Sequence, residues 1–165
     1  MKTFGLMLFL VLPALTDAQV VTAPANTPLL NSKGSFFALS VADIEASTSW
    51  YRDKLGLAVI MKVPRTDATR AAAAVLQGGG LTVELVQHDE AVPLRNFLPA
   101  SRDALFVHGI FKEGVTVDDF DAAIGALRSR GIEMAIGPFP KRGDQPANAI
   151  IRDNAGNYIQ ILGPD

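Results

Sequence analysis

The 165-residue chain contains no cysteine. This absence excludes a disulfide framework, a thiol nucleophile and every metal site built on thiolates. A fold formed by this chain must therefore be stabilised by packing of its apolar residues rather than by covalent cross-links.

The chain also lacks an excess of charge of either sign. It has 15 Lys and Arg against 17 Asp and Glu, which gives a formal net charge of −2. The basic residues are scattered, whereas a surface that binds a phosphate backbone needs clustered Lys and Arg. We therefore expect no nucleic-acid partner. A Gly-x-Ser-x-Gly motif is absent as well, which argues against a hydrolase of that type.

The first 18 residues show the pattern of a secretory signal peptide. Lys2 makes the start positive, residues 4–15 are almost wholly apolar, and residues 16–18 resemble a small-residue cleavage site. The apolar run is shorter than the roughly 20 residues that span a membrane, and it contains Pro13. We expect residues 1–18 to be removed, which predicts a periplasmic or secreted protein without stable membrane insertion. An uncleaved anchor is the alternative.

The residues after the signal divide into an arm and one domain. Residues 19–33 contain two prolines and two asparagines and show no clear hydrophobic period, which is typical of a flexible arm. The remaining residues, 34–165, are long enough to form a single domain with a proper core.

Within that domain a pattern occurs twice, at an offset of 76 residues. The phrase that starts at Val41 and continues into a helical stretch returns at Val117. The same offset places Glu84 and Gln160 at equivalent positions of two apolar strands. Self-similarity at a fixed period indicates one folding unit used twice.

Each half of the domain is predicted to form a strand, a helix and three further strands. The first module is expected over about 35–88 and the second over about 104–163. Asp43 is placed to cap the first helix, and Gly56 to end it with a positive φ. The expected strands are 36–41, 57–63, 71–77, 81–86, 105–115, 132–136, 148–152 and 158–162, and the expected helices begin at Ile44 and Phe120.

Three segments give the chain a resemblance to a known superfamily. They are residues 41–44, the phrase Trp50–Leu57 and the phrase Arg152–Ile161. With them the chain resembles the vicinal oxygen chelate superfamily, which includes glyoxalase I, bleomycin-resistance proteins and extradiol dioxygenases. The resemblance implies an α+β fold in which two βαβββ modules form a curved mixed sheet around a cleft. This fold hosts many reactions and also pure binding.

The resemblance also implies four positions for metal ligands, on the first and last strand of each module. The last-strand positions hold Glu84 and Gln160, whose oxygens can coordinate a metal. The first-strand positions hold Phe36, which has no donor atom, and Lys112, which is a cation without an acceptor. We therefore expect no metal or other cofactor. A divalent metal bound by Glu84, Gln160 and His108 is the alternative.

Two of these side chains allow more than one interpretation. His108 lies roughly 13 Å from Lys112 along a regular strand, so metal binding would need a bulge; otherwise it is an ordinary histidine near a strand end. Lys112 either pairs with Glu84 inside the cleft or reaches solvent near Glu113.

Together these observations predict an exported, metal-free protein that binds a small organic molecule in the cleft between the modules. Phe36, Glu84, Lys112 and Gln160 are the candidate cleft residues. One alternative is a metal-dependent lyase or dioxygenase. Another is a protein-interaction module whose cleft joins two subunits, as in a homodimer. The repeat is compatible with modules that pair within one chain or exchange between two chains.

Overall fold

The computed structural model describes residues 34–99 and 108–164. The predicted signal peptide, the predicted arm and the start of the strand expected over 105–115 lie outside these residues. Residues 34–165 form one compact unit. No helix in the described part of the chain is long and apolar enough to cross a membrane.

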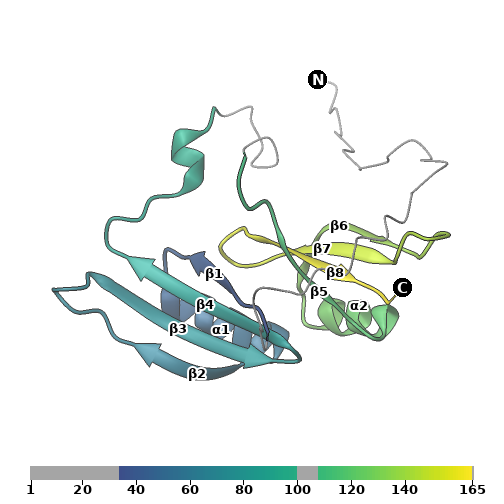
Figure 1. Ribbon diagram of the computed structural model, residues 1–165, viewed down its shortest axis with the longest axis horizontal. Coiled ribbons are helices and arrows are strands. Elements are labelled where there is room, and N and C mark those ends of the chain that lie inside the picture. The colour runs from purple at the N-terminus through teal and green to yellow at the C-terminus, as the bar shows by residue number, and fades with distance from the viewer. Residues whose placement is uncertain (1–33, 100–107, 165) are drawn as a thin grey trace, which may run out of the picture. The chain divides into compact units, whose positions relative to one another are not determined.

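The first module is a four-stranded sheet with one helix. Its strands have the order β1-β4-β3-β2, with β1 parallel to β4 and the other neighbours antiparallel (Figure 1). The helix packs across β2, β3 and β4. The elements are β1 (Phe37–Ser40), α1 (Ile44–Leu55), β2 (Ala58–Val63), β3 (Ala71–Gly78) and β4 (Leu81–His88).

The second module repeats this arrangement. Its strands have the order β5-β8-β7-β6, and β5 is parallel to β8 (Figure 1). A short 3-10 helix, η1 (Leu94–Phe97), lies in the segment that follows the first module. The elements of the second module are β5 (Glu113–Thr116), α2 (Phe120–Ser129), β6 (Glu133–Phe139), β7 (Asn148–Arg152) and β8 (Tyr158–Leu162).

The 76-residue repeat of the sequence is present in the structure. The two helices begin at Ile44 and Phe120, which are 76 residues apart. Each helix has an aspartate as its N-cap: Asp43 accepts a hydrogen bond from the Ala46 amide at 2.9 Å, and Asp119 accepts one from the Ala122 amide at 2.9 Å. The predicted α+β fold of two βαβββ modules is therefore confirmed.

Alternation along the strands gives each sheet two different faces. In β4, Val83 and Leu85 are fully buried in the core, on the side of α1. Their neighbours Thr82, Glu84 and Val86 therefore lie on the opposite side. We call this side of each sheet its helix-free face.

The two modules are joined by polar contacts as well as by the shared core. The Tyr51 hydroxyl of α1 donates to the Asp153 carboxylate of the β7–β8 hairpin at 2.9 Å, and both side chains are buried. Burial and the neighbouring carboxylate raise the pKa of Tyr51 above its ordinary value. Near the ends of the two helices, the Lys54 ammonium donates to the Arg130 carbonyl, and the Arg130 guanidinium donates to the Lys54 carbonyl.

The structure differs from the sequence-based expectation mainly around β5. A strand was expected over 105–115, but residues 108–112 lie outside any strand and β5 begins at Glu113. The reason is the length of its partner, because β8 begins at Tyr158, directly after a tight hairpin turn. Residues 108–111 therefore have no strand beside them. In contrast, β6 extends to Phe139, beyond the end of the strand expected over 132–136.

Candidate functional site

The structure places the four candidate residues in two pairs, one in each module. Phe36 directly precedes β1 and Lys112 directly precedes β5. Glu84 lies beside Ala38 of β1, and Gln160 lies beside Gly114 of β5. By strand alternation, Phe36 shares the helix-free face of the first module with Glu84. Lys112 likewise shares that of the second module with Gln160.

The Lys112 side chain is not paired with Glu84. Within residues 34–99 and 108–164 its ammonium forms no ion pair, and it lies 5.9 Å from the centroid of the Phe111 ring. Partial burial lowers the pKa of Lys112. Burial also raises the pKa of the adjacent Glu113, and the Asp153 carboxylate adds to that effect. Lys112 is thus a partly desolvated cation without an anionic partner among these residues.

The donor atoms near the candidate positions do not fit the metal site that the resemblance implies. The described residues contain no group of three His, Cys, Asp or Glu side chains that could hold a metal ion. His108 is exposed and lies outside β5, so it is not a strand residue facing Glu84 or Gln160. The remaining matched positions, Phe36 and Lys112, offer no acceptor.

Two cationic residues and a tyrosine at one end of the second module were not predicted from the sequence to lie together. Because Glu113 pairs with Ile159, the preceding Lys112 lies beside Tyr158, and Tyr158 pairs with Arg152 of β7. We call Lys112, Tyr158 and Arg152 the cationic row. Tyr158 and Arg152 lie on the helix-free face of the second module, because their strand neighbours Ile159 and Ile151 are buried in the core.

The equivalent residues of the first module carry no charge. Phe36 corresponds to Lys112 and Thr82 to Tyr158 by the 76-residue offset, and Gln77 pairs with Thr82 as Arg152 pairs with Tyr158. The Gln77 amide donates to the Thr82 hydroxyl at 3.1 Å. The sequence contains a signal for this difference in charge between the modules. It lies in the residues on the strands next to Lys112 and in their equivalents in the first module.

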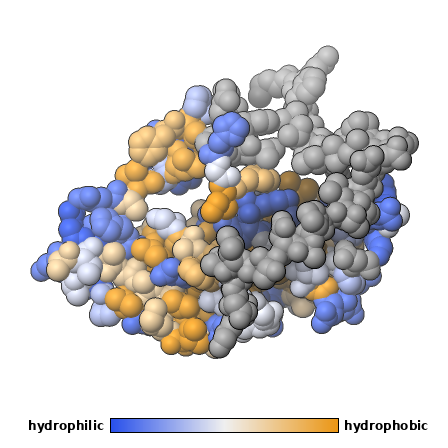
Figure 2. All heavy atoms as spheres, viewed as in Figure 1, coloured by the Kyte–Doolittle hydropathy of each residue, from blue (hydrophilic) through white to orange (hydrophobic). Residues whose placement is uncertain are grey.

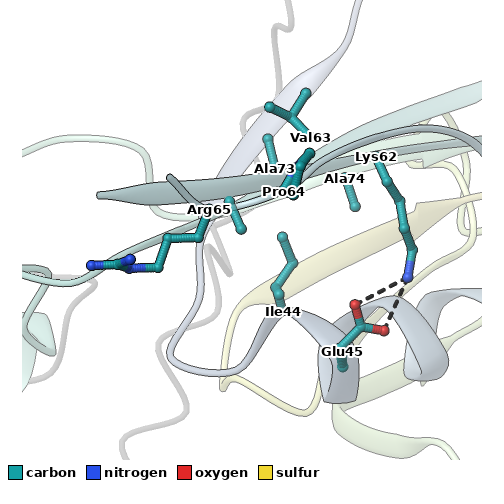
Figure 3. Close-up of a pocket in the computed structure, with 9 residues that line it drawn as sticks. Ile44, Glu45, Lys62, Val63, Pro64, Arg65, Ala73 and Ala74 are labelled. Carbon is teal, nitrogen blue, oxygen red and sulfur yellow. Dashed lines mark hydrogen bonds and ion pairs between the residues drawn. The ribbon is translucent and has the colours of Figure 1, made fainter. Parts of the chain in front are cut away.

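A separate hollow of about 260 Å³ lies on the helix side of the first module. Ile44 faces Ala72 and Ala74, whose small side chains leave space beneath the start of α1. Lys62 and Glu45 form an ion pair with a 3.0 Å separation across one side (Figure 3). Arg65, which also lines the hollow, is paired with Asp67 and Asp89. The charges around this hollow are therefore already paired, which distinguishes it from the cationic row.

The first module also exposes apolar residues along its outer strand. All six residues of β2 are exposed, including Val59, Ile60, Met61 and Val63. Figure 2 shows hydrophobic side chains gathered over this part of the surface. This surface differs chemically from the charged end of the second module.

Solved structures with the same fold provide a comparison. TnmS3, an antibiotic-binding protein from Streptomyces sp. CB03234, is 22% identical, with a TM-score of 0.58 over 81% of this chain and 97% of its own. A glyoxalase family protein from Enterococcus faecalis is 21% identical, with a TM-score of 0.57 over 77% of this chain and 94% of its own. At this identity the likeness shows the fold alone.

A Frankia sp. EAN1pec domain described as glyoxylase/bleomycin resistance protein/dioxygenase is 21% identical, with a TM-score of 0.59 over 81% of this chain and 93% of its own. No curated protein matches the sequence. The family model for the Glyoxalase/Bleomycin resistance protein/Dioxygenase superfamily matches residues 35–161, which include both modules and the cationic row. The chain belongs to that superfamily.

Proposed function

We propose that this protein is exported, holds no metal, and binds a small organic molecule on the helix-free faces of its sheets. The observation that carries the proposal is the pair Phe36 and Lys112 at the two first-strand positions. These residues share their faces with Glu84 and Gln160, so each potential oxygen ligand has a neighbour that cannot coordinate a metal. Antibiotic binding by TnmS3, a protein of the same fold, is compatible with a binding role.

Metal analysis and ligand screening test this function. Purified full-length protein should contain a divalent metal at far below one equivalent per chain. It should also be stabilised against heat by some members of a library of neutral, anionic and cationic organic compounds. Near-stoichiometric metal that is lost in Glu84→Ala would instead support the metal-dependent lyase or dioxygenase. A library without a stabilising compound would contradict the binding role.

Export is tested by the mass of the mature protein. Expression of the full chain in a bacterial host should give a periplasmic or secreted protein that begins near Gln19. A variant without residues 2–18 should stay in the cytoplasm and serves as the control. A full-length protein retained in the membrane fraction would instead support an uncleaved anchor.

An interaction role has one specific observation in its favour, the exposed apolar surface of β2. A second copy of the chain is the partner that we propose for this surface. Sedimentation should then show a dimer that is weakened by Ile60→Glu, and Glu90→Gln, an exposed change outside β2, provides a control. A monomer at all concentrations would contradict this role without affecting ligand binding.

A further inference from the structure

The cationic row gives the proposed ligand a chemical class. Its three residues come from three neighbouring strands: Lys112 precedes β5, Tyr158 begins β8 and Arg152 ends β7. Strand pairing fixes them side by side, because Tyr158 is opposite Arg152 and one residue before Ile159, the partner of Glu113. The relative position of Tyr158 and Arg152 therefore depends on backbone pairing, and Lys112 is one residue away from the paired Glu113.

Direct contacts connect the row through two aromatic rings. The Arg152 guanidinium donates to the Tyr158 hydroxyl at 3.0 Å and lies 5.2 Å from the ring centroid. The Tyr158 ring meets the Phe111 ring edge to face, at 5.5 Å between centroids. The Lys112 ammonium lies 5.9 Å from the Phe111 centroid. The surface thus presents a cation at each end of an aromatic pair.

Both cations are incompletely neutralised. Among the described residues Lys112 has no ion pair, and the single ion pair of Arg152 is with Glu133, at 3.5 Å. The Glu133 side chain is 61% exposed, so solvent weakens this pair. The Arg152 Nε atom is buried without a hydrogen-bond partner. The Arg152 side chain as a whole is 39% exposed, so its terminal guanidinium nitrogens can donate hydrogen bonds to a ligand from solvent.

This arrangement matches an anion that carries an aromatic ring. A carboxylate can accept two parallel hydrogen bonds from one guanidinium. A flat apolar ring can pack against Phe111 and Tyr158 in an offset or edge-to-face arrangement. A ligand with both parts satisfies the charge of Arg152 or Lys112 and covers the rings between them.

We propose that the small molecule bound by this protein is an aromatic carboxylate, held at the cationic row of the second module. The inference rests on the proposed binding function and narrows it to one class of ligand. We expect no such binding of aromatic carboxylates at the first module, because the uncharged residues Phe36, Thr82 and Gln77 take the places of the three row residues.

Three probes of similar shape and different charge test the class of ligand. Binding of 2-naphthoate, 2-naphthamide and 2-(aminomethyl)naphthalene to the full chain is measured by calorimetry at neutral pH and low salt. We expect the carboxylate to bind at least roughly tenfold more tightly than the amide, because charge-assisted hydrogen bonds are the stronger kind. The amine should bind most weakly, and added salt should weaken the carboxylate selectively.

Substitutions locate the bound carboxylate. Arg152→Gln should weaken 2-naphthoate binding roughly tenfold and leave 2-naphthamide nearly unchanged. Arg128→Gln, an exposed change on α2 of the same module, is the matched control. Arg152→Lys keeps the positive charge without the planar fork, so it should retain part of the preference for the anion. It also tests the row if Arg152→Gln fails to fold.

The inference is wrong if the amide or the amine binds as tightly as the carboxylate, or if none of the probes binds. It is also wrong if Arg152→Gln and Arg152→Lys affect 2-naphthoate no more than Arg128→Gln does. The broader function is judged separately by the compound library. Stabilisation by neutral or cationic compounds alone would overturn the assigned class and leave small-molecule binding intact.

Discussion

The two modules share a scaffold and differ in the chemistry of their helix-free faces. Both have an aspartate N-cap at 2.9 Å from a helical amide and the same strand order. The row of Phe36, Thr82 and Gln77 in the first module is neutral, whereas Lys112, Tyr158 and Arg152 in the second carry two positive charges. The comparison shows that the helix caps and strand order, which hold the fold together, are the same in both modules. The modules differ in the side chains of the row, where we propose that the ligand binds.

One core-facing position departs from this rule. Phe37 of β1 packs against the hydrophobic core, and its equivalent in β5 is Glu113. The second module thus places a carboxylate where the first places an aromatic ring. Burial raises the pKa of this Glu113 carboxyl. The helix side of the first strand is therefore also more polar in the second module, at β5, than in the first module, at β1.

The largest expected effect comes from breaking the junction between the modules at Asp153. Its carboxylate accepts four hydrogen bonds, from the Tyr51 hydroxyl, the Ala155 amide and the amide and side chain of Asn157, at 2.8 to 2.9 Å. Asp153→Ala leaves the buried Tyr51 hydroxyl and three part-buried donors without their acceptor. It should lower the free energy of unfolding by about 3 kcal/mol. Urea denaturation measures this loss.

Two further variants show whether that loss belongs to the junction. Asp144→Ala, in an exposed loop of the second module, should have almost no effect. Tyr51→Phe should cost about 1 kcal/mol by itself and much less when Asp153 is already alanine. Additive losses from the two substitutions would contradict a direct coupling of α1 to the hairpin.

Exchanging the rows of the two modules tests whether the difference between them determines ligand preference. The triple variant Lys112→Phe, Tyr158→Thr and Arg152→Gln gives the second module the row of the first. It should bind 2-naphthoate at least roughly tenfold more weakly, since both cations are lost. Calorimetry measures the change, and denaturation in urea checks that the variant folds.

The converse exchange gives a gain rather than a loss. Phe36→Lys, Thr82→Tyr and Gln77→Arg place a second cationic row in the first module. The number of 2-naphthoate molecules bound per chain should rise from one toward two. A preference unchanged by either exchange would show that the ligand is recognised elsewhere.

The helix caps should show how closely the two modules agree. Asp43→Ala and Asp119→Ala each remove a hydrogen bond of the same length to the first turn of a helix. Each should lower stability by about 1 kcal/mol. Asn in place of either aspartate should restore most of that loss. Unfolding experiments that gave clearly unequal losses would show that the scaffold is less symmetrical than the backbone suggests.

The smallest expected effect is the pH dependence contributed by Glu113. Its pKa in the folded protein is raised above the ordinary value of 4.5, so the folded state holds the proton more tightly than the unfolded chain does. Glu113 therefore makes its full contribution to stability below about pH 4.5, and this contribution falls as the pH rises through the pKa of the folded state.

Comparison of Glu113→Gln with the unchanged chain measures this contribution. The variant should become relatively more stable between pH 4 and pH 7, by less than about 1 kcal/mol because the side chain is partly exposed. Asp144→Asn, at an exposed loop position of the same module, is the control. A Glu113→Gln stability curve parallel to that of the unchanged chain would contradict the raised pKa.

The sequence was sufficient to predict most of the fold. Alternating apolar residues and aspartate caps are local signals, and the repeat allowed one module to check the other. The start of β5 was mispredicted because a strand needs a partner, and β8 begins too late to pair with residues 108–111. The start of β5 is thus set by the start of β8, a distant segment, and the residues around β5 themselves give no sign of it.

The candidate site was only partly predictable. The offset identified Phe36 and Lys112 as matched positions, and the strand register supports that equivalence. It did not show the lateral neighbours, because Arg152 and Phe111 approach Tyr158 through strand pairing and ring packing. Lys112 was considered as a partner for Glu84, while the structure places its ammonium over Phe111.

The contact between Lys54 and Arg130 has a consequence for how the modules are held together. These residues are 76 positions apart, and each donates to the backbone carbonyl of the other. Such an exchange has the isologous form found at two-fold interfaces between identical subunits. Two separate copies of one module could form it without any connecting chain. Cutting the segment between β4 and β5 should therefore leave two fragments that still recognise each other.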